Sequence, residues 1–358
     1  MSAKIISRIA IAAVSILQVC IVLSCLTALP DASSACTNGY FSYGGKTIIG
    51  RNMDWEQPDG YVVINARGVK RHALTLPADI RAEWDTKYGY VSFELTQKMP
   101  KGGLLSVPAG GMNEKGLYIA ALWAPDTKYT AQSPDDKRKE ITVGEVAAFA
   151  LAQYATVQEA VDGINSVQVE AFNTGTRDVN LHWFIADSSG ATAYVEFLDG
   201  KAVAHSSPQP AAMTNKTYAE ERAYIKDYAG FGGSKAIPAD MDHEHIKTLD
   251  RFLVIANRVK ETGSGNRPLD VDEVFSALYA ARHTPPRDIK QVTSESATQW
   301  TEVYDYSTKT LYWKSYTTPG IKSLKLDSIN FADSGTKRFI NIHAPGEGDM
   351  ADNLSILY

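Results

Sequence analysis

The chain has 358 residues, of which 44% are hydrophobic and 22% charged, and its formal net charge is -5. This composition is typical of a globular protein with a sizeable core, and the mildly acidic balance without a long basic run argues against nucleic acid as a partner. No stretch after residue 40 is long and apolar enough to span a bilayer, so we expect no stable membrane insertion of that part.

The first 35 residues have the pattern of a secretory signal peptide. Lys4 and Arg8 precede the largely apolar run Ile9–Leu29, and small residues follow up to Ala35. A positive start, an apolar middle and a small-residue exit are the features that signal peptidase recognises. We therefore predict export and cleavage after Ala35, which makes Cys36 the first residue of the mature chain.

Two alternatives to this cleavage remain open at the N-terminus. The apolar run could be retained as a membrane anchor. Alternatively, Val22-Leu23-Ser24-Cys25 resembles a lipoprotein box, which would lead to lipidation of Cys25. A further cleavage would then still be needed to free Cys36.

The predicted elements after Cys36 begin with strands. Gly44-Gly45 predicts a hairpin turn between the strands Thr37–Tyr43 and Lys46–Asn52. Further strand-like runs follow before the first helix: Tyr61–Ala66, Gly89–Leu95 and Leu117–Leu122.

Capping signals predict where helices begin. Thr142 with Glu145 and Thr156 with Glu159 form two successive capping boxes, and Asp270 starts a later amphipathic helix. Between and after these helices the sequence predicts more strands: Leu181–Ala186, Ala193–Leu198, Gln299–Tyr306 and Thr310–Tyr316.

Strands thus come in hairpins rather than alternating singly with helices. This arrangement favours an α+β fold of antiparallel sheets covered by helical layers. We find no repeat and no convincing linker, so we expect residues 36–358 to form one catalytic domain.

A cysteine at the start of a chain can act as a complete catalytic unit. The other two cysteines, Cys20 and Cys25, are lost on the predicted cleavage, so Cys36 cannot form an internal disulfide. A free α-amino group has a pKa of roughly 7.7–8.0 and a thiol one of roughly 8.5, so the amine of the same residue can serve as the base. None of the seven histidines lies in a recognisable catalytic motif.

Two other readings of this cysteine remain. The protein could be a secreted binding module in which Cys36 is merely a packed small hydrophobe. It could also be a papain-like enzyme, which would need a histidine base and would tolerate residues in front of Cys36.

Arg51 and Asp54 could complete the site. Arg51 beside the sulfur would favour the thiolate, and Asp54 could accept a hydrogen bond from the α-amine. In a regular strand these two residues face opposite sides, so both can serve one site only if the strand ends or bends near Asn52. The alternative is a salt bridge on the surface.

Several short stretches after Cys36 form a specific combination, although each alone is a weak signal. They are Cys36-Thr37-Asn38-Gly39, Gly50-Arg51-Asn52-Met53-Asp54-Trp55, Asn113-Glu114-Lys115-Gly116-Leu117, Leu181-His182-Trp183-Phe184-Ile185-Ala186-Asp187, Met213-Thr214-Asn215 and Asp250-Arg251-Phe252. In this order, over most of the chain, they resemble the choloylglycine hydrolase family of N-terminal-nucleophile hydrolases, which holds bile salt hydrolases and penicillin V acylases.

The resemblance implies a four-layer αββα sandwich of two antiparallel sheets. It implies that Cys36 is the nucleophile and that its amine is the base. Arg51 matches the family's arginine near the thiol, and Asp54 matches the carboxylate that orients the amine.

The remaining catalytic groups are also implied by the resemblance. Asn215 matches the side-chain donor to the oxyanion, and the backbone N–H of Trp123 falls at the second donor. Arg251 matches the family's second active-site arginine. From the residues alone, Arg251 lies off the apolar stripe of the amphipathic run Ile246–Val259 and could be a solvated arginine or a first-turn residue that points at a site.

The substrate expectation depends on two tryptophans. Bile salt hydrolases usually carry a small polar residue at the position of Trp123, and Trp55 lies beside Asp54. An aromatic-walled pocket suits a phenoxyacetyl group or a straight acyl chain better than a steroid, whereas both rings could instead belong to the core. The likeness is greatest to the penicillin V acylases of Gram-negative bacteria, which also implies activity on N-acyl homoserine lactones.

The resemblance also sets expectations for assembly and location. We expect a small-molecule acyl amide as substrate and a periplasmic location. A homotetramer is the family's usual state. In bile salt hydrolases a long loop between the positions of Asn215 and Arg251 helps to assemble the tetramer, and this segment is short here. The alternative activity is hydrolysis of conjugated bile salts. We expect no cofactor and no metal, because His243-Glu244-His245 lacks ligand spacing and a third ligand.

Overall fold

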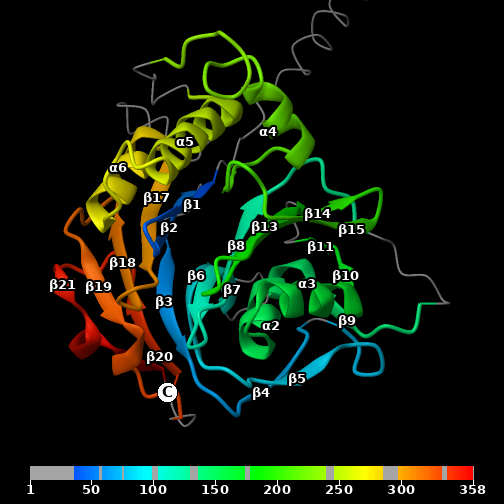
Figure 1. Cartoon of the computed structure of the whole chain (residues 1–358). Coiled ribbons are helices and arrows are strands. Elements are labelled where there is room, and N and C mark those ends of the chain that lie inside the picture. The colour runs from blue at the N-terminus through cyan, green and yellow to red at the C-terminus, as the bar shows by residue number, and fades with distance from the viewer. Residues whose placement is uncertain are drawn as a thin grey trace, which may run out of the picture. The chain divides into compact units, whose positions relative to one another are not determined.

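Two large β-sheets packed face to face form the centre of the fold, as the computed structural model shows (Figure 1). The described residues are 36–55, 59–74, 76–98, 104–129, 136–173, 178–238, 246–284, 297–332 and 337–357. Residues 1–35, with the predicted signal peptide, and His243-Glu244-His245 lie outside them. No helix among the described residues is long and apolar enough to cross a membrane.

The first sheet has seven strands in the order β16-β1-β2-β17-β18-β19-β21. All neighbours are antiparallel except β19 and β21, which are parallel. Its strands are β1 (Thr37–Tyr43), β2 (Lys46–Trp55), β16 (Ala212–Met213), β17 (Ala297–Asp305), β18 (Thr310–Ser315), β19 (Lys322–Lys325) and β21 (Gly348–Asp349).

The second sheet has nine strands, all antiparallel, in the order β15-β14-β13-β8-β7-β6-β3-β20-β22. Its strands are β3 (Gly60–Asn65), β6 (Tyr90–Lys98), β7 (Leu104–Asn113), β8 (Tyr118–Trp123), β13 (Leu181–Ala186), β14 (Thr192–Leu198), β15 (Lys201–Ser206), β20 (Lys337–Asn341) and β22 (Ser355–Leu357).

Outside the two large sheets the described residues also form short two-stranded pairs and single turns of 3-10 helix. They are β4 (Lys70–His72) with β5 (Glu83–Asp85), β9 (Glu140–Thr142) with β10 (Gln168–Glu170), β11 (Phe172–Asn173) with β12 (Asp178–Val179), and the 3-10 turns η1 (Val143–Glu145), η3 (Leu326–Ser328) and η4 (Ala351–Asn353).

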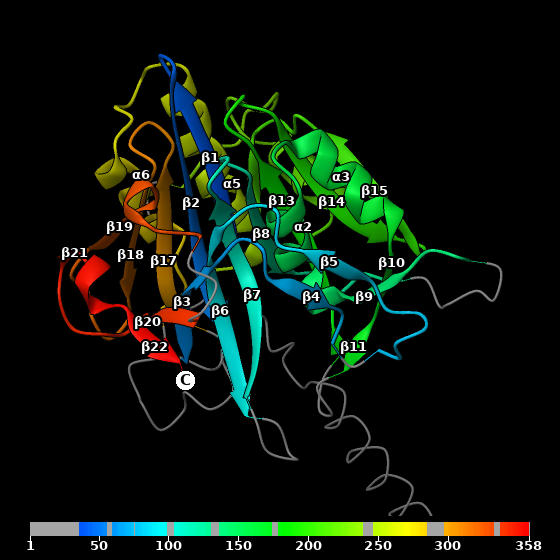
Figure 2. The same ribbon diagram turned by 90° about the horizontal axis from the view of Figure 1, so that it is seen from below.

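Helices cover the outer face of each sheet, which gives four layers (Figures 1 and 2). Over the seven-stranded sheet lie α4 (Tyr218–Ile225), α5 (Thr248–Gly263) and α6 (Val271–Ala280), and over the nine-stranded sheet lie α2 (Val146–Gln153) and α3 (Val157–Ser166). A large apolar cluster fills the space between the two sheets and includes Phe93, Trp300 and Trp313. The expected αββα sandwich is therefore confirmed.

Local sequence signals located most of these elements correctly. The Gly44-Gly45 hairpin is formed, with positive φ at both glycines, and β2 continues beyond Asn52 to Trp55. Both capping boxes form as predicted, at Thr142 and at Thr156, and Asp270 accepts a hydrogen bond from Glu273 N.

Candidate active site

Cys36 lies directly before β1 and is 2% exposed, within the apolar cluster between the sheets. Its Sγ is 3.7 Å from Arg51 Nη2, 3.7 Å from Met53 Sδ and 3.9 Å from the backbone oxygen of Asp54. The residue that we predicted as nucleophile therefore has a guanidinium as a direct neighbour.

Arg51 is fully buried and is held by the second sheet. Its Nη1 donates to Ala109 O, its Nη2 donates to Ala121 O at 2.5 Å, and Nη1 lies 3.4 Å from Glu302 Oε1. Burial by itself lowers the pKa of Arg51, but Cys36 and Glu302 oppose this and raise the pKa above its ordinary value. The cation is thus fixed between the two sheets and points at the sulfur.

A β-bulge explains why a carbonyl is available to Arg51. In the pairing of β6 with β7 the register shifts between Phe93 and Glu94, which leaves Ala109 as the extra residue between Pro108 and Gly110. A bulged residue is released from the regular hydrogen-bond ladder. The carbonyl of Ala109 can therefore accept from the guanidinium instead.

Asp54 interacts with the helical layer on the other side of its sheet. Its carboxylate lies 2.7 Å from Arg251 Nη1 and accepts from Thr298 Oγ1 at 2.5 Å. Arg251 is in the first turn of α5 and also donates to Thr248 Oγ1 at 3.1 Å. Burial raises the pKa of Asp54, although the adjacent guanidinium opposes the change.

Of the two conditions stated for Arg51 and Asp54, β2 does not end near Asn52, because the strand continues to Trp55. Its pairing with β17 is irregular just beyond Asn52, where the register shifts between Thr298 and Trp300. Arg51 faces the second sheet, whereas Asp54 faces α5, and neither is part of a surface salt bridge, since both are fully buried. Cys36 contacts both residues because it lies at the end of the neighbouring strand. Arg251 is likewise buried rather than solvated.

Asn215 and Trp123 meet next to this cluster. Asn215 Nδ2 donates to the backbone oxygen of Trp123 at 2.7 Å, and Asn215 is 5% exposed. In the pairing of β1 with β16, Asn38 is opposite Met213. Cys36, two residues before Asn38, and Asn215, two residues after Met213, therefore lie beyond the same end of this antiparallel pair.

Trp55 and Trp123 pack against each other. Their ring centroids are 5.7 Å apart with an angle of 56° between the planes, and both side chains are only partly buried. Trp55 also contacts the apolar cluster between the sheets. The pair is therefore attached to the core on one side and partly open to solvent.

Sequence reasoning missed Thr298 and Glu302, which contact the predicted site residues from β17. No motif marks either of them. The one signal was a glutamate among apolar residues in a predicted strand, where a charged side chain requires a partner. No cluster that could hold a metal ion occurs among the described residues.

Two facing antiparallel sheets between helical layers, with a buried thiol at the start of the first strand, have the architecture of the N-terminal-nucleophile hydrolases. The family profile described as linear amide C-N hydrolases, choloylglycine hydrolase family, matches residues 36–340. The chain belongs to this family, and it is a linear amide C-N hydrolase of the penicillin V acylase and bile salt hydrolase type.

Individual relatives agree with this assignment. Penicillin V acylase of Pectobacterium atrosepticum is 28% identical over 333 residues, which cover 87% of this chain and 83% of that protein. A bile salt hydrolase/transferase of Clostridium perfringens is 27% identical over 157 residues, which cover 42% of this chain and 44% of that protein.

Solved structures show the same fold. The structure of penicillin V acylase from Agrobacterium tumefaciens matches with a TM-score of 0.71 at 23% identity, over 90% of this chain and 98% of that chain. A mutant of conjugated bile acid hydrolase from Clostridium perfringens matches with a TM-score of 0.67 at 18% identity, over 87% of this chain and 98% of that chain.

Proposed function

We propose that the protein is an exported cysteine amidohydrolase that cleaves penicillin V and N-acyl homoserine lactones. The observation that carries the proposal is the position of the Cys36 sulfur, 3.7 Å from a buried guanidinium of Arg51 and close to the backbone of Asp54. A cation beside a thiol favours the thiolate, which is the nucleophilic form.

The base in this proposal is the α-amine of Cys36, which exists only after the signal peptide has been cleaved off. In the full-length chain the nitrogen of Cys36 is part of a peptide bond, and cleavage after Ala35 would convert it into an amine. The family profile begins its match at Cys36, which supports this cleavage point. The buried Asp54 carboxylate, fixed by Arg251 and Thr298, would then orient the new amine.

The reaction is acyl transfer through a thioester. Cys36 Sγ attacks the amide carbonyl carbon and the α-amine takes the thiol proton. The amine then gives this proton to the leaving nitrogen as the C–N bond breaks, which releases the amine product. Water attacks the thioester with the α-amine as base, and the acid product leaves as the thiol is restored.

Asn215 and the Trp123 backbone N–H are the proposed donors to the oxyanion. A side-chain amide carries two N–H hydrogens, and one of those on Asn215 is already bonded to Trp123 O. The other is left for the substrate. Because the first bond fixes the plane of the amide, the donor is already oriented before the substrate binds.

The Trp55–Trp123 pair supports the choice of substrate. Trp55 directly follows Asp54, the backbone oxygen of Trp123 accepts from Asn215, and both rings are partly open to solvent. Aromatic faces bind a phenoxyacetyl ring or a straight acyl chain through apolar contact. Under this proposal the acyl group lies against the pair while the carbonyl meets Cys36.

Product release from penicillin V, from long-chain N-acyl homoserine lactones and from a conjugated bile salt tests the proposal. We expect cleavage of the first two substrates, and cleavage of the bile salt alone would overturn the substrate assignment. Cys36→Ala and Cys36→Ser should be inactive although folded, as circular dichroism can show. A removable tag in front of Cys36 should abolish activity until it is cleaved off, whereas activity with the tag in place would favour an internal cysteine.

Export and assembly are part of the same proposal. We expect the periplasmic fraction to contain a protein whose intact mass and first residue correspond to a start at Cys36. We expect a homotetramer, which light scattering of the purified mature protein would measure. A mature chain that starts elsewhere and still hydrolyses amides would contradict the proposed base.

A further inference from the structure

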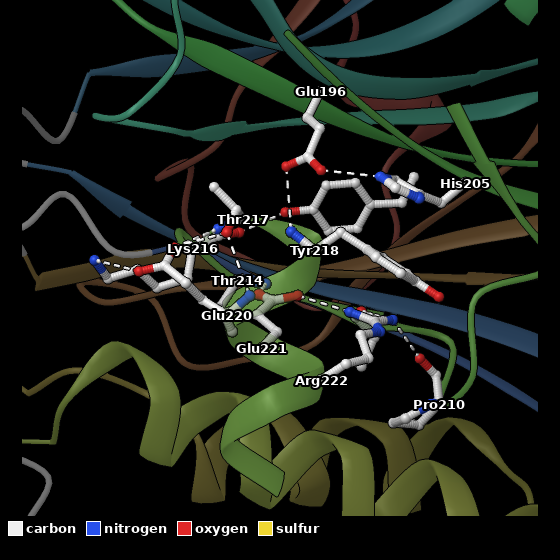
Figure 3. Close-up of polar contacts among 12 residues, drawn as sticks. Glu196, His205, Pro210, Thr214, Lys216, Thr217, Tyr218, Glu220, Glu221 and Arg222 are labelled. Atoms are coloured by element: carbon white, nitrogen blue, oxygen red, sulfur yellow. Dashed lines mark hydrogen bonds and ion pairs between the residues drawn. The ribbon is translucent and has the colours of Figure 1, made fainter. Parts of the chain in front are cut away.

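Thr214, the residue before Asn215, is held on both of its backbone polar groups. Its N–H donates to Glu221 Oε1 at 2.5 Å, and its hydroxyl donates to the same oxygen at 2.7 Å. Its carbonyl oxygen lies 2.8 Å from His182 Nε2. Thr214 and Glu221 are completely buried, and Figure 3 shows the carboxylate between Thr214 and Arg222.

Lys216, the residue after Asn215, is fixed in a similar way. Its backbone oxygen accepts from the Tyr194 hydroxyl at 2.5 Å, and the same hydroxyl lies 2.9 Å from His182 Nδ1. Burial lowers the pKa of His182 to about 3, so its ring is neutral near pH 7. The backbone of both neighbours of Asn215 is therefore bonded to buried side chains, which are Glu221 and His182 for Thr214 and Tyr194 for Lys216.

Arg222 joins this arrangement to the strand that precedes Asn215. Its Nη1 lies 2.9 Å from Glu221 Oε2, and its Nη2 donates to Pro210 O at 2.8 Å and to Ala212 O at 3.2 Å (Figure 3). Its guanidinium also stacks over the Tyr218 ring at 4.2 Å. Glu221 and Arg222, two consecutive residues of α4, thus both form hydrogen bonds with the backbone that precedes Asn215.

Burial of a carboxylate carries a cost of desolvation, which here is offset by two hydrogen bonds from Thr214 and by the ion pair with Arg222. An oxyanion donor, however, must be held in place before the reaction, to within about half an ångström. Asn215 itself is oriented by a bond to Trp123 O. The bond to Trp123 orients the Asn215 side chain, whereas the Glu221 carboxylate fixes the backbone before it through the N–H of Thr214.

We propose that Glu221 is a positioning residue for the Asn215 oxyanion donor and that it acts through Thr214. The inference rests on the proposed function, in which Asn215 stabilises the oxyanion. Glu221 does not touch the substrate. It holds the peptide that carries Asn215 so that the side-chain amide meets the developing negative charge.

The test compares Thr214→Val, which removes the hydroxyl that Glu221 accepts from while keeping the shape, with Thr214→Ser, which keeps the hydroxyl. We expect Thr214→Val to lower kcat roughly tenfold, the effect of one buried hydrogen bond, and Thr214→Ser to remain near the wild-type rate. Thr86→Val is the matched control, because Thr86 is a buried threonine whose hydroxyl donates to Val69 O at 3.0 Å. It should leave kcat unchanged.

Glu221→Gln is the second variant, because it keeps one acceptor oxygen for Thr214 and loses the ion pair with Arg222. Each substitution is also made in an Asn215→Ala background. If Glu221 and Thr214 act through Asn215, neither substitution should lower kcat further there. Losses that multiply in that background would show a general structural effect and would overturn the inference.

Alkylation of Cys36 by iodoacetamide gives a second readout, because this reaction passes through no oxyanion. Its rate should be unchanged in Thr214→Val and Glu221→Gln. A fall in alkylation equal to the fall in kcat would overturn the inference. Activity of Cys36→Ala would instead overturn the proposed function, whereas an inactive Cys36→Ala with a fully active Thr214→Val would reject only the role of Glu221.

Discussion

The guanidinium of Arg251 lies 2.7 Å from the carboxylate of Asp54, across 197 positions of sequence and with both side chains almost completely buried. The pair joins the first turn of α5 to the strand that follows the leading cysteine. It therefore couples the helical layer to the candidate active site.

Removal of one partner of this pair should destabilise the protein strongly. Arg251→Ala leaves the Asp54 charge buried without its cation, and breaking a buried ion pair in this way costs roughly 3–5 kcal/mol. The free energy of unfolding from urea titration measures the loss. The double variant Asp54→Asn with Arg251→Gln leaves no unpaired charge and should be less destabilised than Arg251→Ala. Equal losses in both would mean that the charges matter little to stability.

A second prediction concerns the pH dependence of stability. Burial raises the pKa of Glu302 to about 7 from its ordinary 4.5, with Arg51 opposing the change. The folded chain then binds more protons than the unfolded chain between these two pH values, so the free energy of unfolding falls as the pH rises through this window. The contribution is fully present below about pH 4.5 and amounts to roughly 3 kcal/mol at most.

Glu302→Gln cannot titrate and should flatten this slope between about pH 4.5 and 7. Burial also raises the pKa of Glu221, with Arg222 and Thr214 opposing the change, so this residue contributes a slope of the same sign that should remain. Glu83→Gln is the control, since 66% of that side chain is exposed. Unfolding titrations at several pH values measure the slopes, and an unchanged slope in Glu302→Gln would contradict the prediction.

Much of this fold follows from signals that act over a few residues. Gly44-Gly45 permits positive φ at a tight turn, and Thr156 with Glu159 satisfies the free N–H groups of a helix end. These interactions need no tertiary partner. By contrast, β7 was not predicted, because its run Ser106-Val107-Pro108-Ala109-Gly110-Gly111 contains proline and glycine, which are poor strand formers.

The site itself was only partly predictable. The position of Cys36 and the nearby Arg51 and Asp54 could be read from the sequence, but the direction in which each charge points could not. That direction depends on Ala109 in a bulge of the other sheet and on Arg251 in a distant helix. Such partners are set by the packing of layers, which leaves no local pattern.

A third prediction uses the close approach of Gly110 to Arg51. A Cβ at residue 110 would lie 2.9 Å from Arg51 Nη1 and 2.9 Å from the backbone oxygen of Ile119, so the chain would have to shift. Gly110→Ala should therefore cost about 1–3 kcal/mol of stability and slow the alkylation of Cys36. Gly263→Ala is the matched control, because its Cβ would meet only Ser42 O, at 3.7 Å. Unchanged thiol reactivity in Gly110→Ala would show that Arg51 does not act on the sulfur.

A final prediction separates the two roles of the tryptophan pair. The ring of Trp123 packs on Trp55 at the site, whereas Trp313 is fully buried between the sheets. If the pair binds the acyl group, Trp123→Leu should raise KM for long-chain substrates far more than for an acetyl amide, because a short acyl group cannot reach the ring. Trp313→Leu, the core control, should lower stability without this dependence on chain length. Steady-state kinetics over a series of acyl chain lengths measures the difference, and a uniform change across the series would assign both rings to the core.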